Sequence, residues 1–172
     1  MPSAGAATAA LRARRVKPGC SPTRAAYADL LRRTTADRVV LYGESLGSTV
    51  AVMLAAEQPV RAVLLDSSFE SALAVASASY PWLPVPLLLR DTYRADLAAP
   101  RVTAPVLQVH CEDDPITPLA SALALGAKLA HARPLLRIAK HCHVPSLEDY
   151  DEARSAFVRE AFAGYTIRSG RL

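Results

Sequence analysis

Ser45 is the residue of this sequence whose surroundings most clearly indicate chemistry. It lies in the Gly-x-Ser-x-Gly pattern of residues 43–47, directly after an apolar run over residues 39–42. This order predicts a strand, a sharp turn and a helix over residues 48–58, with the serine at the apex of the turn. Glycines on both sides of the serine would let strand and helix approach closely, because neither carries a Cβ. We therefore expect the hydroxyl of Ser45 to be exposed at the edge of a sheet.

Acidic and histidine side chains follow two later apolar runs. The strand predicted over residues 106–110 leads to an acidic pair, and the strand predicted over residues 135–138 leads to a histidine pair. These residues are Asp113, Asp114, His141 and His143. A serine hydroxyl becomes a good nucleophile when a histidine accepts its proton, and the imidazole needs a carboxylate to fix its tautomer. Because the carboxyl ends of parallel strands share one edge of a sheet, we expect the three groups to meet there.

The elements that must position these groups alternate between buried strands and helices. Besides the strands named above, a strand is predicted over residues 62–65. Helices are predicted over residues 24–33, 48–58, 70–79, 119–130 and 147–163, the first with Ser21 as N-cap. Ser146 and Asp149 form a capping-box pattern at the start of the last helix. This alternation predicts an α/β fold, a three-layer sandwich with a mainly parallel sheet.

Composition limits the classes of function. The 172 residues fit one domain, and the 51% content of hydrophobic residues is typical of a packed globule. The formal net charge is +4, but the first forty residues hold eight of the 20 basic and two of the 16 acidic residues. The remainder is nearly neutral, which argues against a nucleic-acid partner. The most apolar stretch, residues 81–89, is interrupted by Pro84 and Pro86, so we expect no transmembrane helix.

Residues 1–18 and the cysteines bear on domain limits and location. Residues 1–18 are rich in alanine and arginine and contain no acidic residue. We interpret them as a disordered tail or the truncated edge of a longer protein, although they also resemble an organelle transit peptide. Residues 19–172 are then the folded domain. Three cysteines without a secretory signal argue against a disulfide framework and favour a reducing, cytoplasmic location.

From about residue 19 onward, the sequence resembles α/β-hydrolases of the serine-aminopeptidase-like branch, which includes depalmitoylase-like proteins. The matching segments are residues 41–47, 80–85 and 104–110, together with His110, Asp114 and Pro118 at spacings of four. The order Ser, Asp, His along the chain is also that of α/β-hydrolases. The resemblance implies that Ser45 is the nucleophile, Asp114 the orienting acid and His143 the general base. It further implies that the backbone amide of Leu46 is one donor to the oxyanion.

Each of these roles has an alternative in the sequence. Asp113 or Asp66 could supply the acid, and His141 could replace His143 as the base. We expect His131, near a helix end, to be a surface residue or cap. A metal site is a different alternative, because His110-Cys111 and the segment 141–143 could supply N and S ligands. Their spacing matches no zinc signature, so we expect neither a metal nor a cofactor.

The sequence departs from the hydrolase pattern at its start. In the fold that it resembles, the second oxyanion amide comes from a loop after an earlier strand, and we find no such strand or loop. We therefore expect a partial α/β-hydrolase fold whose elbow strand has an exposed edge, with self-association as a consequence. Removing one oxyanion donor costs about a hundredfold to a thousandfold in rate.

Two functions follow from these patterns. The first is a serine hydrolase that cleaves an ester, thioester or amide bond in a small-molecule or acylated substrate. An apolar acyl group would fit if the Pro-rich segment 80–96 forms a lid. The second is a truncated, weakly active or inactive hydrolase-like protein that serves as a binding or assembly partner.

Overall fold

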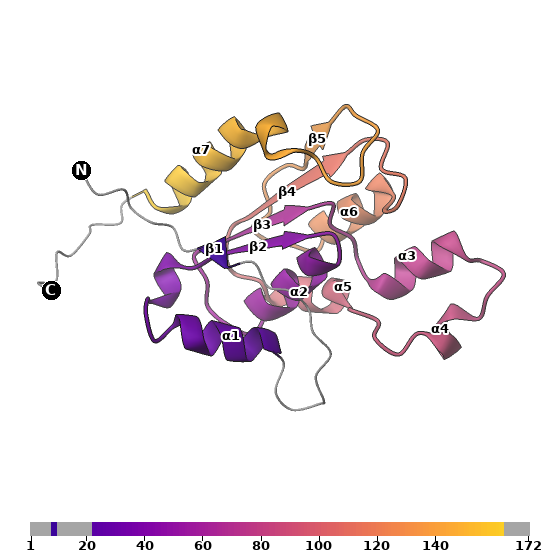
Figure 1. The fold of residues 1–172 in the computed structure, drawn as a ribbon, viewed down its shortest axis with the longest axis horizontal. Coiled ribbons are helices and arrows are strands. Elements are labelled where there is room, and N and C mark those ends of the chain that lie inside the picture. Colours follow the sequence, from indigo (N-terminus) through magenta and orange to yellow (C-terminus); the bar gives the residue numbers. More distant parts are fainter. Residues whose placement is uncertain (1–7, 10–21, 164–172) are drawn as a thin grey trace, which may run out of the picture.

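A parallel β-sheet forms the centre of the fold, with helices on both of its faces (Figure 1). The computed structural model describes residues 8–9 and 22–163. The sheet has the order β1-β2-β3-β4-β5, and each neighbouring pair of strands is parallel. The strands are β1 (Thr8–Ala9), β2 (Val40–Glu44), β3 (Ala62–Asp66), β4 (Val106–Cys111) and β5 (Leu136–Ile138). Because neighbouring strands are parallel, their carboxyl ends share one edge of the sheet, as the arrows of β2 and β3 show in Figure 1.

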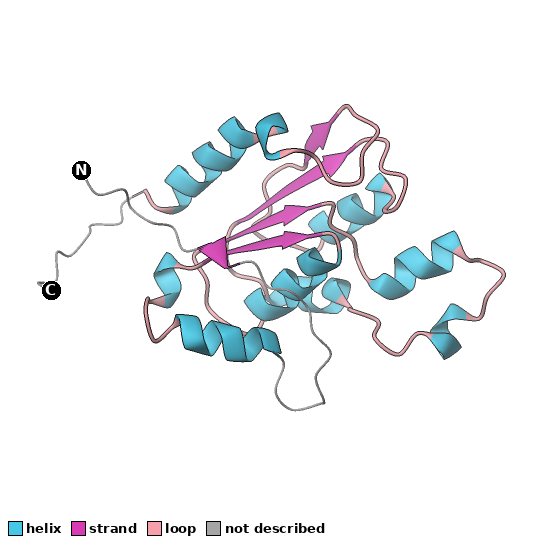
Figure 2. Ribbon diagram, in the orientation of Figure 1, coloured by secondary structure: helices cyan, strands magenta, loops and turns pink. Residues whose placement is uncertain are grey.

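The five predicted helices occur in the predicted order, and two short helices over residues 85–88 and 95–98 were not predicted (Figure 2). They are α1 (Pro22–Leu30), α2 (Leu46–Ala55), α3 (Ala72–Ser79), α4 (Val85–Leu88), α5 (Ala95–Ala98), α6 (Leu119–Gly126) and α7 (Asp151–Ala161). Short 3-10 turns cover Ala36–Arg38, Ala99–Arg101 and Leu147–Asp149. Helix α3 begins later than predicted because the side chain of Ser71 caps it, accepting a hydrogen bond from the amide of Ala74. The N-cap predicted at Ser21 lies outside the described residues.

The last helix differs from the prediction. The capping box of Ser146 and Asp149 is present, but it caps the 3-10 turn over Leu147–Asp149 rather than a long helix. Tyr150 then leaves the helical conformation, with φ −143° and ψ 17°, and α7 begins only at Asp151. The ring of Tyr150 is buried and its hydroxyl donates to Asp66. This tertiary contact overrides the local helical preference.

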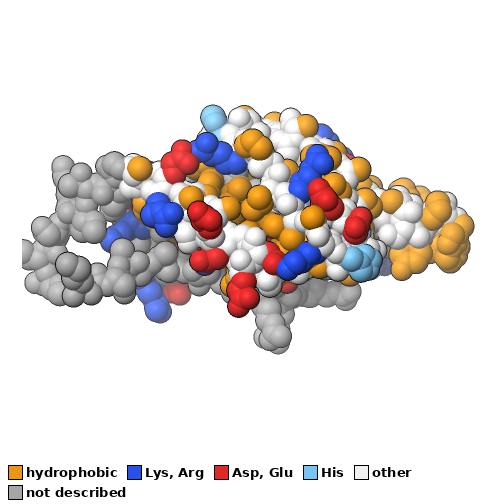
Figure 3. All heavy atoms as spheres, turned by 90° about the horizontal axis from the view of Figure 1, so that it is seen from above, with side chains coloured by type: hydrophobic (Ala, Val, Ile, Leu, Met, Phe, Trp, Pro, Cys, Tyr) orange, Lys and Arg blue, Asp and Glu red, His pale blue; other side chains and the backbone are white. Residues whose placement is uncertain are grey.

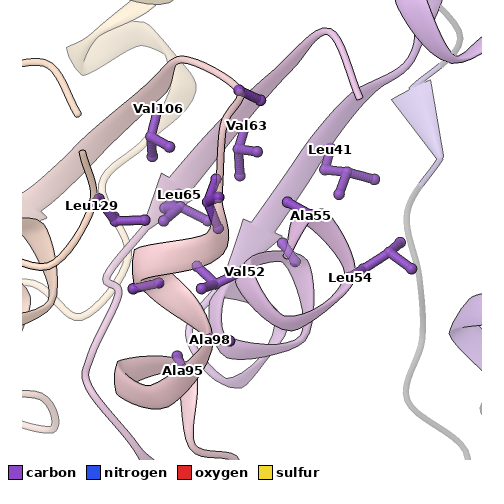
Figure 4. Close-up of a cluster of buried hydrophobic side chains, with 14 of the residues drawn as sticks. Leu41, Val52, Leu54, Ala55, Val63, Leu65, Ala95, Ala98, Val106 and Leu129 are labelled. Carbon is purple, nitrogen blue, oxygen red and sulfur yellow. The ribbon is translucent and has the colours of Figure 1, made fainter. Parts of the chain in front are cut away.

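The two faces of the sheet pack against different helices. Successive residues of a strand point to opposite faces, so Val63 and Leu65 pack in one cluster while Ala62 and Leu64 pack in the other. Figure 4 shows the first cluster, in which Leu41, Val63, Leu65 and Val106 of the strands meet Val52 and Ala55 of α2 and Ala95 and Ala98 of α5. The second cluster joins the sheet to Phe157 of α7. The predicted three-layer α/β sandwich is therefore confirmed.

Strand β1 corrects one expectation. We predicted that the strand before Ser45 would have no neighbour on its outer side, but β1 pairs with it at Thr8 to Val40 and Ala9 to Leu41. This strand could not be predicted, because two residues cannot show periodicity. The pairing reaches only the first two residues of β2. The rest of the segment predicted as a tail, residues 1–7 and 10–18, lies outside the described residues.

The Pro-rich segment 80–96 extends beyond the carboxyl edge of the sheet. It contains exposed apolar side chains, including Trp82 at 76% and Leu87 at 85% relative exposure. Figure 3 shows apolar side chains gathered at this end of the molecule, where α3 and α4 lie. A lid function for the segment stays a prediction. Among the described residues, no helix has the length and apolar character needed to cross a membrane.

Candidate active site

Ser45 sits in a strained turn between β2 and α2. Its φ of 50° and ψ of −121° lie in a region that non-glycine residues rarely adopt. The amide of Ser45 donates to the carbonyl of Asp66 at 2.9 Å, which ties the turn to the end of β3. Ser45 thus stands between the strand and the helix, as the Gly-x-Ser-x-Gly pattern predicts, and it is half-buried.

The two glycines of the pattern differ in their importance. A Cβ on Gly43 would lie 2.5 Å from the carbonyl oxygen of Gly47 and 2.7 Å from Cα of Ser48. Gly43 is therefore required for the close approach of strand and helix. A Cβ on Gly47 would meet nothing within 4 Å. The prediction that both glycines prevent a clash is wrong for Gly47, because this residue lies on the open side of α2.

The start of α2 lies next to the hydroxyl of Ser45. Leu46 is the first residue of the helix, so its amide has no carbonyl acceptor within the helix. The hydroxyl of Ser48 donates to the carbonyl of Ser45 at 2.6 Å, and that of Thr49 donates to the carbonyl of Leu46 at 2.7 Å. These bonds fix the backbone around Ser45. The role of the Leu46 amide as an oxyanion donor stays a prediction.

The structure brings Ser45, His143 and Asp114 into one chain of hydrogen bonds. Ser45 Oγ lies 2.8 Å from His143 Nε2. His143 Nδ1 lies 2.9 Å from Asp114 Oδ2 and 3.1 Å from Asp114 Oδ1. Because an ionised carboxylate can only accept, His143 donates from Nδ1, and Nε2 is left to accept the proton of Ser45. The three residues come from the carboxyl ends of β2, β4 and β5, as predicted.

Asp114 is held in its position by its own turn. Its carboxylate is fully buried and accepts the amides of Ile116 at 2.7 Å and Thr117 at 2.9 Å, and the Thr117 hydroxyl at 2.6 Å. Burial raises the pKa of Asp114, but the bonds from Thr117, Ile116 and His143 together outweigh burial and lower it below the ordinary value. Asp114 is therefore a carboxylate that can orient an imidazole.

A second histidine supports this turn from beneath. His110 is fully buried, and its Nε2 donates to the carbonyl of Thr117 at 3.0 Å. Burial lowers the pKa of His110, although the Thr117 carbonyl and Asp114 oppose the shift. The lowered pKa favours the neutral ring, and His110 Nε2 lies 3.5 Å from Asp114 Oδ2. His110 and Pro118 thus lie on either side of Asp114 in the sequence. Among the described residues, neither forms a hydrogen bond with Ser45.

The alternative site residues lie elsewhere. Asp113, His141 and His131 are exposed. Asp66 is fully buried at the end of β3, where its Oδ2 accepts the hydroxyl of Tyr42 at 2.7 Å and that of Tyr150. Burial raises the pKa of Asp66 despite these two bonds. Among the described residues, none of the three alternatives (Asp113, Asp66 and His141) bonds to the Ser45 side chain, and His131 lies at the surface as expected.

Ser67 is a site residue that sequence reasoning missed. It is fully buried, has a φ of 50°, and donates from its hydroxyl to the carbonyl of His143. Ser67 lies two residues after the segment predicted as a strand, 62–65, so its place near the carboxyl edge of the sheet was the available signal. The carbonyl of His143 is thereby fixed from the side of β3.

A disulfide between Cys111 and Cys142 corrects the prediction made from the cysteine count. Their Cα atoms are 5.7 Å apart and 31 residues separate them in the sequence. The odd total concealed the pair, because adjacent strands β4 and β5 bring these two cysteines together. The bridge also removes both thiolates from the alternative metal set. Across the described part of the chain, no group of three His, Cys, Asp or Glu side chains is placed to hold a metal ion.

A pocket of about 580 Å³ opens on the sheet face covered by α7. Its lining is mostly apolar and includes three charged residues. The lining includes Val40, Leu64, Pro145, Val158, Glu44 and Arg154. Glu44 and the lining residue Val144 directly adjoin Ser45 and His143 in the chain. The pocket therefore borders the segments that carry the nucleophile and the histidine.

Comparison with known proteins is consistent with this geometry. A sequence model described as the alpha/beta hydrolase fold matches residues 21–104, which include Ser45 but end before Asp114 and His143. Two uncharacterized proteins of Mycobacterium tuberculosis are each 40% identical over 96 residues, 56% of this chain. The matched region is 34% of each relative, so the chain spans about a third of their length.

Solved structures show the same fold at low sequence identity. An α/β hydrolase enzyme from a Medee basin deep-sea metagenome library has a TM-score of 0.60 and 16% identity, over 86% of this chain and 73% of that chain. An acetyl xylan esterase from Paenibacillus sp. R4 has a TM-score of 0.64 and 17% identity, over 80% of this chain and 50% of that chain. A Pyrococcus horikoshii acylaminoacyl peptidase has a TM-score of 0.63 and 16% identity, over 85% of this chain and 28% of that chain. The chain therefore has an α/β-hydrolase fold.

Proposed function

We propose that this chain is a serine hydrolase that cleaves an ester, thioester or amide bond, with Ser45 as nucleophile, His143 as general base and Asp114 as orienting acid. The observation that carries the proposal is the continuous contact from Ser45 Oγ through the His143 ring to the Asp114 carboxylate, at 2.8 and 2.9 Å. Such contacts are within the reach that proton transfer requires. The assignment to a serine-aminopeptidase-like or depalmitoylase-like branch stays a prediction.

The first half of the reaction acylates the enzyme. Ser45 Oγ forms a bond to the substrate carbonyl carbon while its proton moves to His143 Nε2. Asp114 stabilises the resulting imidazolium through Nδ1. The amide of Leu46 donates to the tetrahedral oxyanion. When the intermediate collapses, the bond to the leaving oxygen, sulfur or nitrogen breaks, and the leaving group takes the proton from Nε2.

The second half releases the acid. Water gives a proton to His143 Nε2 and adds to the acyl carbon, and a second tetrahedral intermediate forms. Its collapse breaks the bond to Ser45 Oγ, which recovers its proton from Nε2. Turnover is slow if Leu46 is the only oxyanion donor, since loss of one donor costs about a hundredfold to a thousandfold. Such slow turnover would correspond to the alternative function, a weakly active or inactive hydrolase-like binding partner.

Features around the site favour an apolar acyl group. The exposed Trp82, Leu87 and Leu88 belong to the segment that extends from the same edge of the sheet as Ser45. The pocket beside Glu44 and Val144 offers further apolar surface. An esterase, a lipase and a peptidase are among the proteins with similar structures. Acylated small molecules are therefore the substrate class to test first.

Covalent labelling with a fluorophosphonate probe tests the proposal. The wild-type chain should be labelled on Ser45, and Ser45→Ala should lose the label. Ser79→Ala is a matched control, because Ser79 is an exposed serine at the end of α3. A parallel assay with p-nitrophenyl butyrate measures turnover. Labelling that persists in Ser45→Ala would overturn the proposal, whereas labelling without turnover would favour the weakly active alternative.

A further inference from the structure

The Cys111–Cys142 disulfide joins the two segments that carry the acid and the histidine. Cys111 is the last residue of β4 and precedes Asp114 by three positions, while Cys142 directly precedes His143. The hydrolytic steps use no cysteine side chain of the protein. The bridge is therefore a feature of the site that the proposed chemistry leaves unexplained.

The segment that carries His143 has few other attachments. It follows β5, a strand of three residues at the edge of the sheet. Within the described part of the chain, residues 141–145 make no hydrogen bond between backbone groups. The Ser67 hydroxyl holds the carbonyl of His143, and the ring contacts Asp114 and Ser45. Pro145 is buried and Val144 is half-buried, so both add apolar packing, and the disulfide is the covalent attachment of this segment to β4.

The other end of the bridge is rigid. Cys111 is fully buried, and all six residues of β4 are buried between β3 and β5. Asp114 is fixed separately by the amides of Ile116 and Thr117 and by the Thr117 hydroxyl. Opening the bridge should therefore leave the acid in place and release the histidine. A displacement of about 1 Å in a reacting group can cost on the order of a hundredfold in rate.

We propose that Cys142 is a positioning residue for His143, and that reduction of its bridge to Cys111 turns the site down reversibly. This inference rests on the proposed function, since it assigns a consequence to the same Ser45–His143 contact. The site would thus respond to the thiol–disulfide balance of its surroundings.

The switching chemistry requires a dithiol as reductant. Cys142 is partly exposed and Cys111 is buried, so the thiolate of the dithiol attacks Cys142 Sγ and the bond between the two sulfurs breaks. Cys111 leaves as a thiolate and takes up a proton. The second thiol of the reductant then attacks the mixed disulfide, which frees Cys142 as a thiol and closes the reductant into a cyclic disulfide. Glutathione disulfide reverses the change by oxidising both cysteines.

The experiment compares both redox states of a Cys20→Ser protein, which retains only the two bridging cysteines. Oxidised protein and protein treated with dithiothreitol are measured for the rate of fluorophosphonate labelling and for kcat and KM with p-nitrophenyl acetate. Reduction should lower the labelling rate and kcat about tenfold to a hundredfold, with KM changed less than twofold. Glutathione disulfide should restore both rates. Circular dichroism establishes that the reduced protein stays folded.

Cys142→Ser on the same background provides the matched variant. It cannot form the bridge, so its rates should be low and the same with and without dithiothreitol. The signal of the His143 Nδ1 proton, measured by nuclear magnetic resonance, gives a readout independent of turnover. It should show the bond to Asp114 in the oxidised protein and lose it on reduction.

The outcomes separate this inference from the proposed function. Equal labelling rates and an unchanged His143 signal in both redox states would overturn the inference, while labelling of Ser45 would still support the hydrolase. If neither state is labelled, the proposed function fails, and the His143 signal alone decides whether Cys142 positions the ring. Unfolding on reduction would also overturn the inference, because the bridge would then hold the fold rather than the histidine.

Discussion

Ser67 and His143 are joined by a hydrogen bond from the buried serine hydroxyl to the histidine backbone carbonyl, across 76 positions of sequence. Ser67 adopts a φ of 50° in doing so. The end of β3 thus holds the backbone carbonyl of His143, while Asp114 contacts its ring. These two contacts act on the same segment as the bridge from Cys111 to Cys142.

Removing the Ser67 hydroxyl should weaken both the fold and the site. We expect Ser67→Ala to lose about 1–3 kcal/mol of unfolding free energy, because the carbonyl of His143 loses its partner. Ser67→Gly loses the same bond but relieves the positive φ, which is worth about 1–2 kcal/mol. Glycine should therefore be the more stable variant in urea unfolding, with labelling slowed equally in both. A normal labelling rate in Ser67→Gly would contradict the positioning role.

The acid and the base can be tested against their exposed neighbours. Asp114→Asn should lower kcat by about 10⁴-fold, because an amide does not hold the imidazole in the required tautomer. His143→Ala should be at least as damaging. Asp113→Asn and His141→Ala are matched controls, since both side chains are exposed. An equally large loss in either control would assign the role to that residue instead.

The residues near Ser45 could be predicted because local sequence determines them. The Gly-x-Ser-x-Gly turn needs only its own strand and helix, and the acidic and histidine pairs follow apolar runs whose ends share one edge. The choice between Asp113 and Asp114 depended on resemblance. The structure separates them physically, because only Asp114 lies within the turn that Ile116 and Thr117 close.

Contacts between distant segments could not be predicted. The bond from Ser67 to His143, the bridge from Cys111 to Cys142 and the break at Tyr150 each depend on which strands become neighbours. The odd cysteine count pointed away from the bridge. Tyr150 follows a correct capping box, and it is the buried partner Asp66 that interrupts the helix there. Such pairings are tertiary, and they override local preference.

Gly43 and Gly47 should respond in opposite ways to alanine. Gly43→Ala places a Cβ 2.5 Å from the carbonyl oxygen of Gly47, so the backbone must move. We expect the free energy of unfolding to fall by about 1–3 kcal/mol. In Gly47→Ala the new Cβ meets open space within helix α2, and the free energy of unfolding should rise by about 0.5–1 kcal/mol because alanine is the better helix former. Thermal unfolding of the two variants measures the difference. Destabilisation by Gly47→Ala would contradict this prediction and show that Gly47 is required for a reason other than the space around its Cα.

The buried carboxyl of Asp66 should make stability depend on pH. Burial raises its pKa in the folded chain, so the folded state holds the proton more tightly than the unfolded state does. The contribution of Asp66 is therefore complete below the ordinary carboxyl pKa of about 3.9, and it is lost as pH rises through the raised value.

Comparison with Asp66→Asn isolates this contribution. The unfolding free energy of the wild type, relative to the variant, should fall as pH rises above about 4, by at most about 1.4 kcal/mol per pH unit. Asp91→Asn serves as the exposed control. A relative free energy that rises with pH would mean that the bonds from Tyr42 and Tyr150 dominate over burial.

The spacing of the triad along the chain has a consequence for the order of folding events. Ser45 and His143 are 98 residues apart, and Asp114 and His143 are 29 apart. Contacts of such long range form late, because closing the intervening chain costs entropy before the contact returns any free energy. Helices α2 and α7 can gain their local structure earlier. During refolding, fluorophosphonate labelling of Ser45 should therefore recover later than the helical circular dichroism signal. The recovery of labelling would mark the time at which β2, β4 and β5 have paired in the sheet.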